Sequence, residues 1–319
     1  MGCCRRSLPF RLCLGPLFFF VALERSGAME TLTLWLDGIS RNRVAQLMLV
    51  GWSFIFLIEG ASGFGTPAAL AAPILVGLGF PPLRVAVLCI VMNAVPTSFG
   101  AVGTPTWFGL GSLGLTQAQL LEIGLKTALM HSVAALVIPV IALRFVLDWK
   151  EIRSNLLFVE LAVLASVLPM ICVATIALFG ALIFVQLLTI DGSRASTLIL
   201  GDALAYWTGN LWVYFAGFLG ALGSFFSGSN TISNLTFGPI QLRIAQDLGL
   251  ASTTMLSLQT VGAAMGNMVA IHNIVAVCAV LGLKDQEGAI LQKTFIPTLV
   301  YGIILAILAG LWLAMAPAA

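Results

Sequence analysis

The sequence predicts an all-α polytopic membrane protein, a helical bundle with two pseudo-repeats that contain broken or re-entrant helices. Hydrophobic residues make up 60% of the chain and charged residues only 9%, whereas a soluble domain carries about 25% charged residues. The mean hydropathy is +1.05, and the apolar residues come in blocks of membrane-spanning length. Glycine, proline and small polar residues interrupt these blocks at comparable places in the two halves of the chain.

Residues 1–25 form an atypical N-terminal segment. Arg5, Arg6 and Arg11 precede an apolar stretch over residues 17–23, which is typical of a signal sequence or a short first span. No small-residue cleavage site follows cleanly. We therefore expect an uncleaved N-terminal span or a misassigned start.

Residues 26–147 are expected to form the first half of a transporter. Apolar blocks predict helices over residues 44–58, 68–80 and 83–97. Glu122 and Lys126 lead into a further span that ends near Val146. Each block should be helical, because lipid cannot satisfy free backbone groups.

Residues 148–202 are expected to form a shortened middle segment. Asp148, Lys150, Glu151 and Arg153 predict a polar loop at its start. Residues 155–190 then leave room for one long or two short spans, with Glu160 as their only charge.

Residues 203–319 are expected to form the second half. Apolar blocks predict a span over residues 206–226, one or two more over 244–283, and a last span over 295–315. A polar loop is expected before the last span, from Lys284, Asp285, Glu287 and Lys293.

Helix-breaking residues gather at two places in each half. They occupy residues 59–67 and 93–105 in the first half, and 223–239 and 266–273 in the second. A broken backbone is tolerated in lipid only where protein or a wet cavity surrounds it. Matching breaks in two halves are a sequence indication of a secondary-transporter site. Pro67 also favours a helix start with Thr66 as its cap, and such a start suits a carboxylate.

These motifs resemble the signature regions of bacterial lactate permeases. The first region has EGASGFGTP at residues 59–67, GLGFPPL at 77–83 and NAVPTSFGAVGTP at 93–105. The second has GSFFSGSNT at residues 223–231, GNM at 266–268, and His272 with Asn273. The similarity runs from about residue 26 to the C-terminal span, and residues 1–20 do not share it.

The resemblance implies a proton-coupled carrier for L-lactate, D-lactate and glycolate in the bacterial inner (cytoplasmic) membrane. Family members are considerably longer, and most of the difference lies in the middle segment. The alternatives are therefore a non-transporting, truncated permease remnant, or a carrier for another small carboxylate coupled to sodium.

Glu59 is the candidate for proton coupling. It ends an apolar block and opens the first glycine-rich break, and Arg84 is the only other charge in residues 44–121. An ionisable group at membrane depth costs on the order of a few kcal/mol and is functional by default. The alternative is a structural role at the interface, as a helix cap or as the partner of Arg84.

The candidate substrate-binding residues combine flexible backbone with small polar side chains. Glycine permits close backbone approach, and hydroxyl and amide groups can bond a carboxylate and a 2-hydroxyl. The competing interpretation is tight helix packing through small residues. The candidates are Gly63, Gly65, Thr66, Asn93, Ser227, Gly228, Ser229, Asn230, Thr231 and Asn267.

Two histidines and one charge pair complete the set. His272 is a second candidate for proton coupling, with a hydrogen-bonded structural role as the alternative. His131 lies in an apolar block, where interhelical hydrogen bonding is the favoured interpretation. Arg243 and Asp247 are four residues apart and should pair on a helix surface.

Other function classes find little support. The chain lacks an HExxH motif, and its histidines are few, so we expect no enzyme activity, no catalytic residues, no metal and no cofactor. No basic stripe indicates nucleic acid. The expected partners are lactate or a related monocarboxylate, protons (or sodium) and the lipid bilayer.

Overall fold

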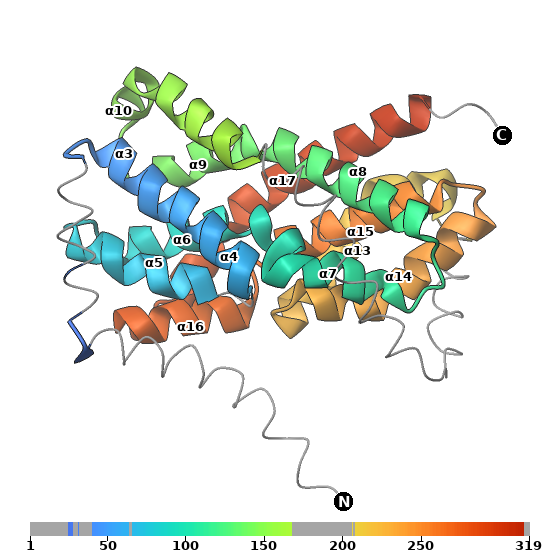
Figure 1. Cartoon of the computed structure of the whole chain (residues 1–319), viewed down its shortest axis with the longest axis horizontal. Coiled ribbons are helices and arrows are strands. Elements are labelled where there is room, and N and C mark those ends of the chain that lie inside the picture. The colour runs from blue at the N-terminus through green and yellow to red at the C-terminus, as the bar shows by residue number, and fades with distance from the viewer. Residues whose placement is uncertain are drawn as a thin grey trace, which may run out of the picture.

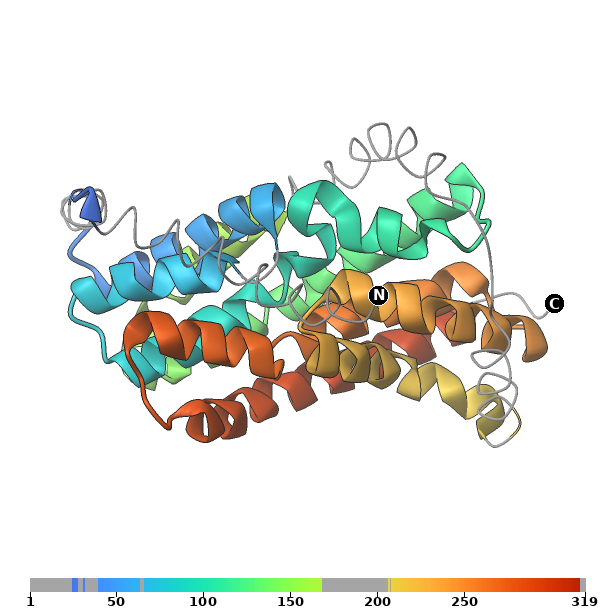
Figure 2. The same ribbon diagram turned by 90° about the horizontal axis from the view of Figure 1, so that it is seen from below.

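Every element that the structure describes is helical. The computed structural model describes residues 25–27, 31, 40–63, 66–167, 206 and 208–315, and no strand occurs in these ranges. Figure 1 shows the helices packed in an elongated bundle, and Figure 2 shows the bundle from below. The predicted all-α membrane fold is confirmed. The N-terminal span expected over residues 1–25 lies outside the described residues, apart from Arg25.

The first half begins with one long apolar segment and continues with shorter helices. α3 (Arg43–Met48), the π-helical turn η1 (Leu49–Phe54) and α4 (Ile55–Ser62) follow one another without a break. α5 (Thr66–Gly77) begins where Pro67 predicts a helix start, and α6 (Pro82–Asn93) follows it. The 3-10 turn η2 (Pro96–Phe99) and α7 (Gly100–Gly111) complete the group.

The next helices lead into the middle segment. α8 (Gln117–Ala135) starts at a capping box on Thr116 and continues into α9 (Ile138–Arg144). The polar loop expected at residues 148–153 is wrong, because α10 (Trp149–Ser154) forms there. Glu151 in its first turn and Arg153 in its last turn complement the helix dipole. A short apolar helix, Leu156–Val167, follows.

The second half repeats the order of short and broken helices. The 3-10 turn η3 (Gly209–Leu211) leads into α13 (Trp212–Ser227), which is followed by α14 (Asn230–Asp247). α15 (Ser252–Gly266), α16 (Ile271–Leu281) and α17 (Glu287–Met315) complete the chain.

Two expectations for this half need correction. The broken stretch was expected to reach residue 239, but α14 runs unbroken from Asn230 through Pro239. Neighbouring helices can satisfy the backbone carbonyl that a proline frees, so an internal proline is tolerated here. The loop expected before the last span also ends early, because Glu287 and Lys293 lie in α17. Glu287 in the first turn suits the helix dipole.

The two halves interlock through reciprocal contacts. α7 packs against α14 of the second half, and α16 packs against α5 of the first half. Likewise α8 packs against α15, and α17 packs against α6. Figure 1 shows the crossing, with α16 beside α5 and α7 beside α14. In each pair of contacts, a helix of the first half packs against the second half in the same way as its counterpart packs against the first half. Such reciprocal contacts are expected of two pseudo-repeats.

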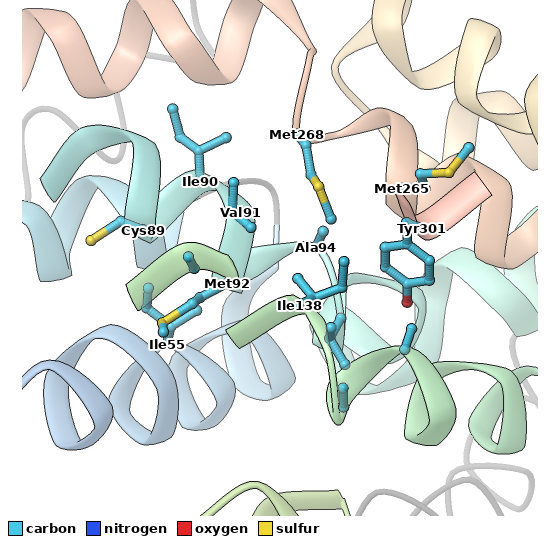
Figure 3. Close-up of a cluster of buried hydrophobic side chains, with 14 of the residues drawn as sticks. Ile55, Cys89, Ile90, Val91, Met92, Ala94, Ile138, Met265, Met268 and Tyr301 are labelled. Atoms are coloured by element: carbon cyan, nitrogen blue, oxygen red, sulfur yellow. The ribbon is translucent and has the colours of Figure 1, made fainter. Parts of the chain in front are cut away.

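The breaks after α6 and α15 meet in the core. Ala94 follows the end of α6 and Met268 follows the end of α15, and both are fully buried. Figure 3 shows the Met268 side chain pointing toward Ala94 within a cluster of apolar side chains. Glycines permit a similarly close approach between α13 and α15, where a Cβ on Gly262 would lie 1.9 Å from the Gly217 carbonyl oxygen.

Several helices meet the length and composition needed to cross a membrane. In the described part of the chain these are Arg43–Ala61, Gln117–Arg144, Ser252–Leu281 and Glu287–Ala314. Pro82–Asn93 and Pro96–Gly111, bent by 52°, make a fifth if the pair is one span. The chain is therefore a multi-pass membrane protein with at least one sharply bent segment.

Candidate functional site

A buried polar cavity lies where the two halves meet. The end of α4, the segment from η2 to the start of α7, the turn between α13 and α14, and the end of α15 form its walls. Its volume is about 20 Å³, which is room for about one water molecule, so the cavity is narrow in this conformation. The lining residues are Glu59, Gly63, Thr97, Gly100, Ala101, Pro105, Gly228, Ser229, Asn230, Thr231 and Asn267.

Two glycines end the helices that lead to the cavity. α4 stops at Gly63 and α13 stops at Gly228, and both glycines have a left-handed φ, of +65° and +67°. Glycine adopts this conformation without the steric cost that a Cβ brings. Gly63 also touches the other wall, because a Cβ there would lie 3.1 Å from the backbone nitrogen of Ala101. The same local signal stops a helix at the cavity in both halves.

Glu59 is buried in the last turn of α4. Its exposed fraction is 1%, and among the described residues no cation forms an ion pair with it. Arg84, the partner considered from sequence, lies exposed in the first turn of α6. The Asn93 side chain lies within hydrogen-bonding reach of the carboxyl group, and a Cβ on Gly100 would lie 2.5 Å from Glu59 Oε1. The carboxyl group is therefore enclosed by neutral groups.

The chain reverses its helical hand beside Glu59. Ala101, Val102 and Gly103 have left-handed φ values of 45°, 59° and 81°. A left-handed β-branched residue such as Val102 is rare, and strained backbone of this kind costs on the order of 1–3 kcal/mol per residue. The Thr104 hydroxyl donates to the Ala101 carbonyl oxygen at 2.6 Å and helps to hold the turn. The first half thus brings strained backbone to the cavity.

The start of α14 brings backbone donors to the opposite wall. Ser229 caps this helix, since its Oγ accepts from Ile232 N at 3.3 Å and its carbonyl oxygen accepts from Ser233 N at 3.1 Å. The N–H groups of Asn230 and Thr231 are therefore the ones that the first turn does not use. They lie at the positive end of the helix dipole, a favourable place for an anion.

Acceptor oxygens without partners also surround the cavity. Within the described residues, Glu59 Oε2, Asn93 Oδ1, Asn230 Oδ1 and Asn267 Oδ1 are buried and lack a hydrogen-bond partner. A buried acceptor left unpaired costs about 1–3 kcal/mol. Each can gain a partner only from a donor such as a hydroxyl or a bound proton. The site therefore offers backbone donors at the start of α14 and unpaired acceptor oxygens from both halves.

The structure brings most of the candidate residues together. Glu59, Gly63, Gly228, Ser229, Asn230, Thr231 and Asn267 line the cavity. Asn93 lies behind the wall beside Glu59, whereas Thr66 is not among the lining residues. Gly65 lies outside the described residues.

The other two candidates, Ser227 and His272, lie beside the turn between α13 and α14. Ser227 does not line the cavity, and its Oγ instead accepts from Ser229 N at 3.2 Å and donates within the turn. His272 is exposed on the first turn of α16, and a Cβ on Gly228 would lie 2.9 Å from its Cβ. His272 therefore lies next to the cavity wall without forming part of it.

Part of the first wall was not predicted from the sequence. Thr97, Gly100, Ala101 and Pro105 line the cavity although only Asn93 of this motif was a candidate. The sequence signal for these residues was the glycine- and proline-rich motif at residues 93–105. Residue types alone do not predict that the backbone there turns left-handed. His131 bonds other helices, as the favoured interpretation held: its Nε2 lies 2.8 Å from Ser98 Oγ, and its Nδ1 bonds the Tyr301 hydroxyl.

The described residues contain no cluster of at least three His, Cys, Asp or Glu side chains that could hold a metal ion. The predicted surface pair forms, with Arg243 Nε 3.1 Å from Asp247 Oδ2. The chemistry available at the cavity is therefore that of one buried carboxyl group, backbone donors and amide side chains.

Comparison with known proteins places this site in a family. The family model described as L-lactate permease matches residues 8–175 and 165–316, nearly the whole chain. The chain belongs to the lactate permease family. The match begins at residue 8, so the expectation that residues 1–20 lie outside the similarity is wrong. The other expectation, that the resemblance continues to the C-terminal span, is confirmed.

Individual relatives agree with the family model. A Haemophilus influenzae protein with the provisional name L-lactate permease is 36% identical, covering 94% of this chain and 86% of its own length. The Escherichia coli K12 L-lactate permease is 22% identical over 92% of this chain and 82% of its own length. The Escherichia coli K12 glycolate permease is 31% identical over 43% of this chain and 24% of its own length. No solved structure matches the chain.

The alignment with the Haemophilus protein has more positions than this chain has residues. The Haemophilus alignment has 455 positions and this chain has 319 residues, so at least 136 positions are gaps in this chain. The two family-model matches adjoin at residues 165–175.

Proposed function

We propose that this permease carries L-lactate and related 2-hydroxy monocarboxylates, D-lactate and glycolate, across the bacterial inner membrane together with protons. The supporting observation is the buried cavity between the two halves, with a carboxyl group on one wall and the start of an 18-residue helix on the other. Relatives named for lactate and for glycolate support the substrate class.

The substrate carboxylate would bind at the start of α14. The N–H groups of Asn230 and Thr231 would donate to it, and the helix dipole would add favourable electrostatics. Ser229 keeps this end of the helix in place through its bond to Ile232 N, 3.3 Å long. Gly228 removes side-chain bulk from the same turn, so the substrate can approach the backbone closely.

Glu59 would couple the proton to the substrate. A charged Glu59 would repel a second anion in this enclosed cavity, whereas a protonated Glu59 would not. Binding of the proton and of lactate would then strengthen each other by the same factor. A protonated Glu59 also supplies a donor to a cavity rich in unpaired acceptor oxygens. His272, next to Gly228, is the proposed second group on the proton path.

Alternating access would follow from movement between the interlocked halves. The cavity has walls from both halves, so a shift of one half against the other would change which side of the membrane it faces. The left-handed residues 101–103 and the glycine ends of α4 and α13 are the places where the backbone is not held by helical bonds.

Lactate counterflow in proteoliposomes tests the proposal. Vesicles loaded with unlabelled lactate should take up labelled lactate transiently, and an inward proton gradient should drive accumulation. A sodium gradient in place of the proton gradient should have no effect. Accumulation driven only by sodium would replace protons as the coupling ion and leave the rest of the proposal intact.

A non-transporting remnant is the second candidate, favoured by the gaps of at least 136 alignment positions. This candidate predicts a protein that inserts in the membrane and gives no counterflow with any 2-hydroxy acid. Counterflow separates the two cases, and thermal stabilisation of the purified protein by lactate shows whether a chain that does not transport still binds the substrate.

A further inference from the structure

A chain of buried polar side chains leads away from the cavity. Asn230 Nδ2 donates to Ser98 Oγ at 3.2 Å, and Ser98 Oγ lies 2.8 Å from His131 Nε2. His131 Nδ1 in turn bonds the hydroxyl of Tyr301. All four side chains are at most 2% exposed. The chain joins α14, η2, α8 and α17, and Figure 3 shows Tyr301 at the edge of the core cluster.

The surroundings fix which way the Asn230 amide points. Its Nδ2 also donates to the backbone carbonyl oxygen of Thr260, at 3.3 Å. A carbonyl oxygen can only accept, so the NH₂ group must face Thr260 and Ser98. Both amide hydrogens are then engaged. The remaining polar atom, Oδ1, is buried without a partner in the described residues, and Asn230 lines the cavity.

The same reasoning assigns the direction of the remaining bonds. The buried Tyr301 hydroxyl needs an acceptor, which His131 Nδ1 provides only when the imidazole carries its hydrogen on Nε2. Ser98 Oγ then accepts from His131 Nε2 and from Asn230, and it donates its only hydrogen to the Thr260 carbonyl oxygen at 3.2 Å. Every donor in the chain has one acceptor under this assignment. The imidazole of His131 thus keeps the Ser98 hydroxyl in the orientation that accepts the hydrogen bond from Asn230.

We propose that Asn230 Oδ1 recognises the 2-hydroxyl of the substrate, and that His131 is a positioning residue that acts through Ser98. This inference rests on the proposed function. The anion of a 2-hydroxy monocarboxylate has one hydrogen-bond donor, its hydroxyl, since carboxylate oxygens only accept. An acceptor-only atom such as Oδ1 can therefore bond the hydroxyl and not the carboxylate. The carboxylate keeps the backbone donors of α14.

The consequence is discrimination against acids that lack the hydroxyl. Propionate has the carbon skeleton of lactate without the 2-hydroxyl, and its binding would leave Oδ1 buried and unpaired. A site built to bond a hydroxyl rejects the analogue that lacks it. We expect lactate to compete for the site at about tenfold lower concentration than propionate, or lower still. Glycolate, which keeps the hydroxyl, should stay close to lactate.

Variants along the chain of bonds test the role of His131. The measurement is inhibition of labelled lactate counterflow by unlabelled lactate and propionate, reported as the ratio of the two half-inhibitory concentrations. Ser98→Ala and His131→Asn should bring this ratio toward one, mainly through weaker lactate binding. His131→Gln should keep most of the ratio, because its longer side chain can place an amide N–H near the position of Nε2. Asn is too short to reach that position.

A matched control lies next to His131. The Ser132 hydroxyl donates to the Ala128 carbonyl oxygen of its own helix at 2.7 Å, so Ser132→Ala removes a hydroxyl from α8 without touching the chain of bonds. Its ratio should equal that of the unmodified protein. Equal weakening of lactate and propionate in Ser98→Ala and His131→Asn would mean a structural role only, and would overturn the inference.

The outcome can be separated from that of the proposed function. Lactate counterflow with a lactate-to-propionate ratio near one would overturn the inference and leave the transport proposal intact. If counterflow is absent, thermal stabilisation of the purified protein by lactate and by propionate gives the same ratio without transport. Stabilisation by neither acid would overturn both proposals.

Discussion

The two helix breaks of this permease deliver different chemistry to one cavity. The first half brings the buried Glu59, in the last turn of α4, and the left-handed residues 101–103, at the start of α7. The break after α13 brings a capped helix start and uncharged amide and hydroxyl groups. Both breaks begin with a left-handed glycine, Gly63 or Gly228. A helix that ends at a glycine therefore positions a titratable group in one half and a pre-organised anion site in the other.

The difference indicates how a two-half carrier can divide its work. Glu59 lies in the last turn of α4, one turn before the helix stops at Gly63, so a change in its charge acts next to backbone that is not helical. An anion site works best on a rigid element, because its donors must already point at the substrate. The following predictions separate these two roles, from the largest expected effect to the smallest.

Removing the charge of Glu59 should have the largest effect on coupling. Glu59→Gln mimics the protonated carboxyl group permanently, so accumulation driven by a proton gradient should fall at least about tenfold. Counterflow should persist, because exchange of one lactate for another does not need the proton to be released. Normal gradient-driven accumulation by this variant would remove Glu59 from the mechanism.

Crowding Glu59 should come next. A Cβ on Gly100 would lie 2.5 Å from Glu59 Oε1, so Gly100→Ala should displace the carboxyl group and cost about 1–3 kcal/mol in stability. Gly60→Ala is the matched control. Gly60 lies in the same turn of α4 as Glu59, and a Cβ there would meet no neighbouring atom within 4 Å. Thermal unfolding in detergent and uptake should both distinguish the two variants, and equal behaviour would contradict the assigned contact.

The two left-handed glycines should differ in their response to alanine. Gly228 lies in the left-handed helical region (φ 67°, ψ 16°), where alanine costs about 1–2 kcal/mol. Gly63 (φ 65°, ψ −156°) lies in a region that essentially only glycine occupies. The steric contacts are comparable, because the new Cβ would lie 3.1 Å from the Ala101 backbone nitrogen at Gly63 and 2.9 Å from the His272 Cβ at Gly228. Gly63→Ala should therefore lower the melting temperature more. A larger loss in Gly228→Ala would mean that the second break is the more tightly packed one.

Loss of the α14 cap should have the smallest effect on stability and a visible effect on affinity. Ser229→Ala removes the acceptor for Ile232 N, at a cost of about 1 kcal/mol. The KM for lactate should rise while the response to the proton gradient stays normal. Ser154→Ala removes an exposed hydroxyl at the end of α10 and should leave KM unchanged. An unchanged KM in Ser229→Ala would argue against carboxylate binding at this helix start.

Residue patterns predicted which helices form better than they predicted where each helix begins and ends. The apolar blocks predicted the spans, and Pro67 predicted the start of α5 at Thr66. The loop expected at residues 148–153 is α10, because charges placed to suit the helix dipole outweigh their polarity. Asn230 to Pro239 looked broken from composition alone, yet α14 is continuous because neighbouring helices can complete the bonds that Pro239 cannot make.

The sequence by itself determined that the chain is a membrane protein, that glycine-rich motifs interrupt its apolar segments in both halves, and that Glu59 is the charge at the start of the first motif. Those properties follow from residue types and local conformation. The tertiary structure decided that Thr97 and Gly100 line the same cavity as Asn230, and that His131 is linked to Asn230 through Ser98. Local sequence cannot encode these pairings, because they depend on how helices distant in the chain cross and how closely small residues let them approach.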